Sequence, residues 1–209
     1  MNLKNTQLGF LILAGGQSRR MGVDKWRLKW GEQTFLERLV DVGRQVAAQT
    51  VVSLGSRQTI EPFDFPDVSI VRDSHSGCGP LAGIEAGLRD LAKHRIDLAF
   101  VTACDHPEIG PLWVQRLVER IGTHEAIMPR DGDRFFGLTA VYRTSLASTA
   151  RAMLDSGEYR VQDWIARLDV RAVDLSELQS WGLDLRALNN INTPTAYQDL
   201  GKRDRWQKP

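Results

Sequence analysis

The segment LILAGGQSRRMGVDK, residues 11–25, joins the end of an apolar run to a group of glycines and cations. The apolar run covers residues 8–14 and stops at Gly15 and Gly16, a pattern typical of a short buried strand that ends in a turn. Adjacent glycines leave backbone N–H groups accessible and let the chain turn tightly around an anion. The cations of the segment are Arg19, Arg20 and Lys25. Because such cations neutralise phosphate oxygens, the segment predicts a phosphate-binding turn after the first strand, although a flexible loop with solvated cations also fits.

The rest of the chain alternates between the patterns of strands and helices. Short apolar or β-branched runs predict strands at 50–54, 68–71, 98–103, 125–129, 138–143 and 171–175. Apolar residues at helical spacing predict helices at 34–47, 79–94, 111–121, 146–155 and 161–168, with a last helix beginning at Thr193-Pro194. This alternation predicts an α/β fold with a mostly parallel sheet and helices on both faces. With no linker or repeat in the sequence, we expect a single domain over residues 1–209.

The composition excludes several classes of protein. The chain has 209 residues, of which 42% are hydrophobic, and a formal net charge of +1. Without an overall positive field we expect no binding to nucleic acid. No apolar stretch approaches 18 residues and the first ten residues lack a signal-peptide core, so we expect a cytoplasmic protein that binds no membrane. Two cysteines, Cys78 and Cys104, make no disulfide framework and are expected to be reduced thiols.

Aspartates follow two other predicted strands. Asp73 comes after the strand at 68–71, and Asp105 comes after the strand at 98–103. Ligands of open parallel sheets bind beyond the carboxyl ends of the strands. A carboxylate at that edge suits Mg²⁺, which takes one or two carboxylates together with substrate phosphates. An ordinary strand-to-helix loop at Asp73 and a turn cap at Asp105 explain the same residues without a ligand, so both interpretations stay open here.

Other familiar sites are absent from the sequence or weakly supported by it. The chain has no Walker A motif, no Gly-x-Gly-x-x-Gly and no Gly-x-Ser-x-Gly. Four residues could be imagined as zinc ligands: His75, Cys78, Cys104 and His106. A single residue separates the second pair, and Cys104 is expected to point into the core, so we do not favour a zinc site.

Four segments taken together resemble a known family. They are LAGGQSRRMGVDK (13–25), RDSHSGCGPLAG (72–83), CDHP (104–107) and NINTP (190–194). In content and order they are similar to the molybdenum cofactor guanylyltransferases of the nucleotidyltransferase superfamily, over nearly the whole chain. The resemblance implies a Rossmann-like fold with a nucleotide-binding half at about 8–107 and an acceptor-binding half at about 108–200. It also implies Mg²⁺-dependent transfer of GMP from GTP to the terminal phosphate of Mo-molybdopterin, with release of pyrophosphate.

The resemblance also implies the roles of individual residues. The nucleotide-binding residues carried over are Leu13, Ala14, Gly15, Gly16, Lys25, Ser53, Asp73 and Asp105. Lys25, assisted by Arg19 or Arg20, would act on the β- and γ-phosphates, and Asp105 would hold Mg²⁺. Ser53 is assigned only because it stands near the place of an asparagine in relatives. At Phe136-Gly137, a stretch that would face the pterin, the sequence departs from the His-Pro or Gln-Pro that relatives often carry. The resemblance therefore says less about the identity of the acceptor than about nucleotide binding.

Three alternatives remain beside this interpretation. A cytidylyltransferase acting on the same pterin differs mainly in its base, for which Gly16 favours guanine by analogy with the guanylyl-transferring branch. A sugar-phosphate nucleotidyltransferase is less favoured, because such chains commonly add a second domain. A catalytically idle nucleotide-binding partner of molybdoenzymes or other cofactor-assembly proteins is disfavoured by the presence of both Lys25 and Asp105.

Overall fold

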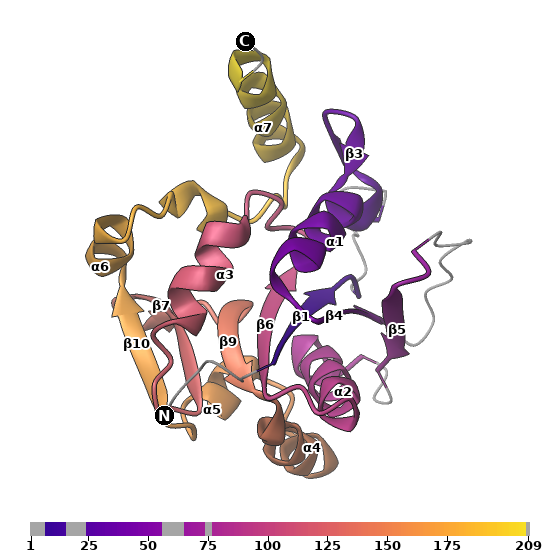
Figure 1. Ribbon diagram of the computed structural model, residues 1–209, viewed down its shortest axis with the longest axis vertical. Coiled ribbons are helices and arrows are strands. Elements are labelled where there is room, and N and C mark those ends of the chain that lie inside the picture. The colour runs from indigo at the N-terminus through magenta and orange to yellow at the C-terminus, as the bar shows by residue number, and fades with distance from the viewer. Residues whose placement is uncertain (1–6, 16–23, 56–64, 74–76, 208–209) are drawn as a thin grey trace.

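The computed structural model describes residues 7–15, 24–55, 65–73 and 77–207, and is built around one large sheet (Figure 1). Its strands are β1 (Leu8–Leu13), β4 (Gln49–Leu54), β5 (Val68–Arg72), β6 (Leu98–Ala103), β7 (Ala126–Asp131), β8 (Arg134–Phe135), β9 (Thr139–Arg143) and β10 (Val170–Asp174). They lie in the order β10–β7–β9–β6–β1–β4–β5, and β8 pairs with β7. The sheet therefore runs through both halves of the sequence.

Most neighbouring strands are parallel. β1 lies between β4 and β6 and is parallel to both, β4 is parallel to β5, and β7 is parallel to β10. β9 is antiparallel and lies between β6 and β7. The carboxyl ends of all the parallel strands consequently meet at one edge of the sheet, and β9 begins at that same edge. The predicted mostly parallel sheet is confirmed.

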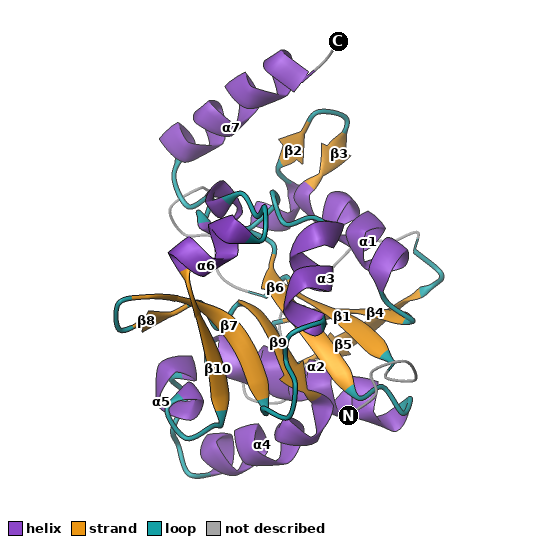
Figure 2. Ribbon diagram, turned by 60° about the vertical axis from the view of Figure 1, so that its left-hand side comes forward, coloured by secondary structure: helices purple, strands orange, loops and turns teal. Residues whose placement is uncertain are grey.

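Helices cover both faces of this sheet. The longer helices are α1 (Phe35–Val46), α2 (Pro80–Lys93), α3 (Pro111–Val118), α4 (Ala147–Asp155), α5 (Val161–Ile165), α6 (Leu175–Ser180) and α7 (Pro194–Gln207). Figure 2 shows α1, α3 and α6 over one face and α2, α4 and α5 against the other. The predicted two-sided α/β arrangement is confirmed, and the predicted helices and strands stand within a few residues of their observed bounds.

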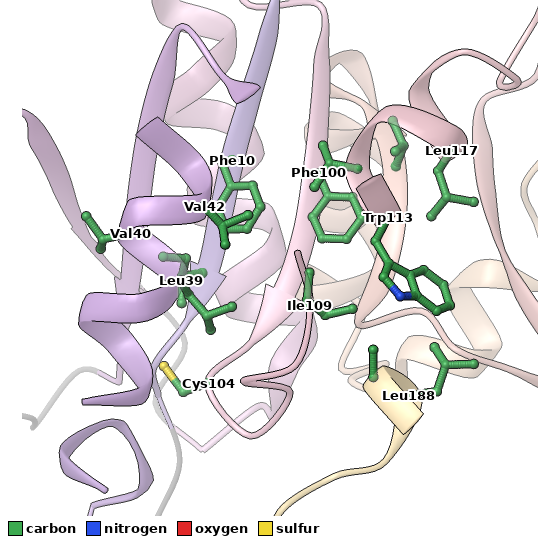
Figure 3. Close-up of a cluster of buried hydrophobic side chains, with 14 of the residues drawn as sticks. Phe10, Leu39, Val40, Val42, Phe100, Cys104, Ile109, Trp113, Leu117 and Leu188 are labelled. Atoms are coloured by element: carbon green, nitrogen blue, oxygen red, sulfur yellow. The ribbon is translucent and has the colours of Figure 1, made fainter. Parts of the chain in front are cut away.

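The strand β1 shows why both faces must be covered. Phe10 and Ile12 pack into the cluster that includes residues of α1 and α3, whereas Leu11 and Leu13 pack into the cluster against α2. Figure 3 shows the first cluster, in which the stacked rings of Phe10 and Phe100 face the helices. Successive side chains of a strand point to opposite faces, so a strand that is apolar at every position is buried on both sides.

The helix α1 begins with a capping box. The Thr34 hydroxyl accepts a hydrogen bond from the Glu37 N–H at 3.1 Å, and the Thr34 N–H donates to the Glu37 carboxylate at 2.6 Å. These two bonds satisfy backbone donors that have no partner within the helix. The helix predicted at 34–47 therefore has its cap at the first predicted residue.

Several short elements lie beyond the predicted pattern. The strands β2 (Lys29–Trp30) and β3 (Gln33–Thr34) form a small hairpin that turns at Gly31, where φ is +64°. The last helix, α7, projects from the sheet next to this hairpin (Figures 1 and 2). Leu200 of α7 packs with Leu28, Phe35 and Ile191 in a small separate cluster. The cluster thus ties the segment just after Lys25 to the end of the chain. Among the described residues, no helix is long and apolar enough to cross a membrane.

Candidate active site

Four segments that follow adjacent parallel strands meet at the carboxyl edge. The Ala14 N–H donates to the Ser53 carbonyl at 2.9 Å, the Cys104 N–H to the Leu13 carbonyl at 3.1 Å, and the Asp73 N–H to the Leu54 carbonyl at 3.2 Å. The sheet hydrogen bonds thus continue just past the ends of the strands. They bring the turns after β1, β4, β5 and β6 together, as the sequence predicts for a ligand-binding edge.

Gly15 stands where two of these turns approach closely. A Cβ atom at position 15 would lie 2.9 Å from the backbone nitrogen of Gly55, a distance that side chains do not tolerate. The residue is therefore glycine at least in part because the turn after β1 touches the backbone after β4. A larger side chain at this position would displace backbone, so it would disturb the edge as well as any ligand.

Lys25 and Asp105 form an ion pair at this edge. Lys25 begins a short 3₁₀ helix (Lys25–Arg27), and its Nζ lies 2.8 Å from Oδ2 of Asp105. The side chain of Lys25 is 25% exposed and that of Asp105 is 13% exposed, so the pair is reachable from solvent but mostly enclosed. The structure thus joins two residues, 80 positions apart, that the sequence assigned to one site.

Asn192 also contacts the Lys25 ammonium. Its Oδ1 accepts a hydrogen bond from Lys25 Nζ, and the neighbouring Ile191 N–H donates to the Asp105 carbonyl at 2.8 Å. In the sequence this segment contributes to the family resemblance, but Asn192 has no predicted role. The motif NINTP was the signal that could have found it.

One carboxylate oxygen at the site has the properties of a metal ligand. Oδ1 of Asp105 is buried and has no hydrogen-bond partner among the described residues. The described residues contain no group of three or more His, Cys, Asp or Glu side chains that could hold a metal. A single carboxylate with a spare oxygen fits Mg²⁺, which fills its other positions with water and substrate phosphates. The residues present therefore fit a divalent ion that binds together with a phosphorylated ligand.

The zinc cluster considered in the sequence does not form among the described residues. Cys78 and Cys104 are buried free thiols, and burial is the main cause that raises the pKa of Cys104 above its ordinary value. A thiol with a raised pKa is a poor metal ligand, because the thiolate is the form that binds. Both ring nitrogens of His106 are engaged by protein groups, and His75 lies outside the described residues.

Other predicted residues differ in how accessible they are. Leu13 and Ala14 are nearly buried, so their contribution to a ligand would come from the backbone. Ser53 is 2% exposed and its hydroxyl faces Gly83 of α2, so its side chain is enclosed between strand and helix. This placement argues against a direct contact between the Ser53 hydroxyl and a base. Asp73 lies at the end of β5, at the same edge as Asp105.

Part of the predicted site lies outside the described residues. This part comprises Gly16, Arg19 and Arg20. In the predicted acceptor-binding half, Gly137 packs against Ile165 and Tyr142, and its carbonyl accepts a hydrogen bond from the Tyr142 hydroxyl at 2.8 Å. Gly137 therefore serves the packing of α5, and the proposed contact of the Phe136-Gly137 stretch with a pterin remains a prediction.

Comparisons with known proteins agree on one family. A family model described as "MobA-like NTP transferase domain" matches residues 10–172. A probable molybdenum cofactor guanylyltransferase of Methanosarcina mazei is 34% identical over 200 residues, which cover 91% of this chain and 88% of that protein. A probable molybdenum cofactor guanylyltransferase of Opitutus terrae is 34% identical over 185 residues, covering 87% of this chain and 91% of that protein.

Solved structures share the fold. Molybdopterin-guanine dinucleotide biosynthesis protein A of Archaeoglobus fulgidus has a TM-score of 0.77 at 23% identity, over 95% of this chain and 100% of that chain. A cytidylyltransferase for 2-C-methyl-D-erythritol 4-phosphate from Thermus thermophilus has a TM-score of 0.66 at 16% identity, over 93% of this chain and 98% of that chain. The same architecture therefore occurs with more than one base and acceptor, and the choice between them rests on residues rather than on the fold.

Proposed function

The chain belongs to the MobA-like NTP transferase family, and on that premise we propose that it transfers GMP from GTP to the terminal phosphate of Mo-molybdopterin. The products are Mo-molybdopterin guanine dinucleotide and pyrophosphate. The single observation that carries the proposal is the Lys25–Asp105 pair, joined by Asn192, at the carboxyl edge of β1 and β6. At this edge the Lys25 ammonium and the Asp105 carboxylate lie close enough to act on the same phosphorylated ligand.

The reaction brings two polyanions together. An oxygen of the acceptor phosphate attacks the α-phosphorus of GTP, the bond from that phosphorus to the bridging oxygen breaks, and pyrophosphate leaves. A phosphate monoester is already ionised near neutral pH, so no general base is required to remove a proton. The demands on the protein are in-line placement and neutralisation of charge.

Lys25 serves the leaving group in this proposal. Before a ligand binds, its ammonium is held by Asp105 and Asn192. We assign it to the β- and γ-phosphates, where a point charge stabilises the pyrophosphate as it leaves. Arg19 is assigned as its assistant, and the backbone amides near Gly15 and Gly16 as donors to phosphate oxygens.

Asp105 is the residue we assign to a divalent metal, and Mg²⁺ is the ion we propose. The assignment is supported by the spare buried oxygen of Asp105. When bound there, the ion supplies a positive charge that withdraws electron density from the phosphate under attack. Asp73 is proposed as a nucleotide contact because it lies at the same edge.

The experiment is to measure pyrophosphate release with Mo-molybdopterin and each of the four nucleoside triphosphates, with and without Mg²⁺. We expect release with GTP, in the presence of both the pterin and the metal. A preference for CTP would overturn the assignment of the base and indicate a cytidylyltransferase. Binding of GTP without any release would indicate an idle nucleotide-binding protein. Reactions without the pterin serve as the control for simple hydrolysis.

A further inference from the structure

His106 is a buried histidine next to Asp105, the aspartate that we assign to the metal. The proposed transfer reaction gives this histidine no role. Its side chain stands in the turn after β6, and the residue is 3% exposed. The ring nitrogen Nε2 lies 2.8 Å from Oδ1 of Asn190, and Nδ1 lies 3.2 Å from the Thr139 hydroxyl. A buried ring with both nitrogens hydrogen-bonded has a fixed orientation, because hydroxyls and carboxamides can each donate or accept.

The bond from Nε2 reaches the segment that carries Asn192. His106 bonds to Asn190, and the Asp105 carbonyl accepts from the Ile191 N–H at 2.8 Å. Two consecutive residues of the turn thus hold two consecutive residues of the C-terminal segment. The next residue of that segment, Asn192, accepts a hydrogen bond from the Lys25 ammonium. A short chain of contacts therefore leads from the His106 ring to the proposed catalytic lysine.

We propose that His106 is a positioning residue for the transfer reaction. Through Nε2 it holds Asn190 against the Asp105 turn, so that Asn192 keeps the Lys25 ammonium in place. The imidazole itself contacts neither substrate nor metal in this role. The inference rests on the proposed function for its effect on turnover, whereas the docking of the segment can be measured without any substrate.

The two ring nitrogens allow a matched pair of substitutions. In His106→Gln the side-chain amide reaches the position of Nε2, and in His106→Asn it reaches only the position of Nδ1. His106→Gln can therefore keep the contact with Asn190 and lose the contact with Thr139. His106→Asn does the reverse. Each variant loses one buried hydrogen bond, so the two are expected to lose similar thermal stability.

The expected results differ between the variants. For His106→Asn we expect kcat for pyrophosphate release to fall about tenfold, because a small displacement of a positioned group costs on this scale. We expect the KM for GTP to change less than kcat. His106→Gln should stay within about twofold of the unsubstituted protein. Hydrogen exchange measured by mass spectrometry should show faster exchange over residues 186–193 in His106→Asn alone.

A double-substitution cycle tests whether His106 acts through Asn190. If His106 acts through Asn190, His106→Asn combined with Asn190→Ala should be no slower than Asn190→Ala alone. Equal losses of kcat and equal exchange in the Gln and Asn variants would overturn the proposal. If the unsubstituted protein releases no pyrophosphate, the proposed function fails. In that case the hydrogen exchange over residues 186–193 tests the positioning role by itself. Equal exchange in His106→Asn and His106→Gln would refute that role.

Discussion

At the scale of single residues, the ion pair between Lys25 and Asp105 indicates more about the reaction of the protein than about the stability of its fold. In an ion pair that is mostly enclosed, the cost of desolvating both charges offsets much of their attraction, so the pair is weak evidence for stability. Each residue follows a buried strand at the predicted ligand-binding edge, and the family resemblance implied the role of each. Asn192 had no predicted role, because its contact with Lys25 spans 167 positions and only the NINTP motif pointed to that segment.

Asp105→Asn tests the metal assignment. Removing the negative charge should lower turnover by about 10²-fold or more, the usual scale for one preorganised electrostatic group, and denaturant unfolding shows whether the variant remains folded. Pyrophosphate release and denaturant unfolding are the measurements. The matched control is Asp169→Asn. Asp169 is 61% exposed and paired with His124, and it precedes β10 at the edge of the sheet opposite to the site. Turnover near that of the control would remove Asp105 from the mechanism.

Asn192→Ala tests whether the carboxamide steadies the lysine. Without this acceptor the Lys25 ammonium loses a side-chain partner that holds it beside Asp105, and we expect kcat to fall about tenfold. Asn189→Ala is the control, because Asn189 is exposed and lies in the same segment. The idea fails if single-turnover rates of the two variants agree.

At the scale of elements, the periodicity of apolar residues predicts the large helices and strands. It does not predict the short elements or their positions. Each strand of the β2–β3 hairpin has only two residues, which is too short for any pattern to appear. The hairpin matters because it shares a cluster with α7. Its position, and with it the position of Lys25, depends on long-range packing that no local pattern encodes.

Leu200→Ala tests the docking of α7. Leu200 is 0% exposed in the cluster with Leu28, Phe35 and Ile191, and removing such a side chain costs about 2–5 kcal/mol of local packing. We expect faster hydrogen exchange in residues 194–202 and a lower turnover, because Ile191 precedes Asn192. Leu112→Ala, which truncates a 42% exposed leucine of α3, should change neither quantity. Unaltered exchange in α7 would show that this contact does not hold the helix.

At the scale of the whole molecule, acid should weaken the fold through specific carboxylates. Asp67, in the turn before β5, accepts two hydrogen bonds from Arg44 of α1, at 2.8 and 2.7 Å. These bonds lower the pKa of Asp67 from 3.8 to about 2. The Arg167 guanidinium likewise lowers the pKa of Glu158 below its usual value. A group whose pKa is lowered by folding stabilises the folded state above its unfolded pKa and loses that contribution as pH falls.

The pH dependence of Asp67→Asn follows from this sign. At about pH 6 the unsubstituted protein should be the more stable, and the difference should shrink as pH falls from about 4 to about 2, where Asp67 becomes neutral as well. Because both side chains are exposed, the difference should also shrink in high salt. Urea unfolding of both proteins across this range gives the comparison. A difference that grows in acid would contradict the lowered pKa.

The order of synthesis gives the contact between Lys25 and Asn192 a further meaning. The two residues are 167 positions apart, and ribosomes add about 5–20 residues per second, so roughly 10–30 s separate their appearance. Throughout that interval the nascent chain has its first turns but lacks the segment that steadies the lysine. The full surroundings of Lys25 can therefore assemble only late in translation.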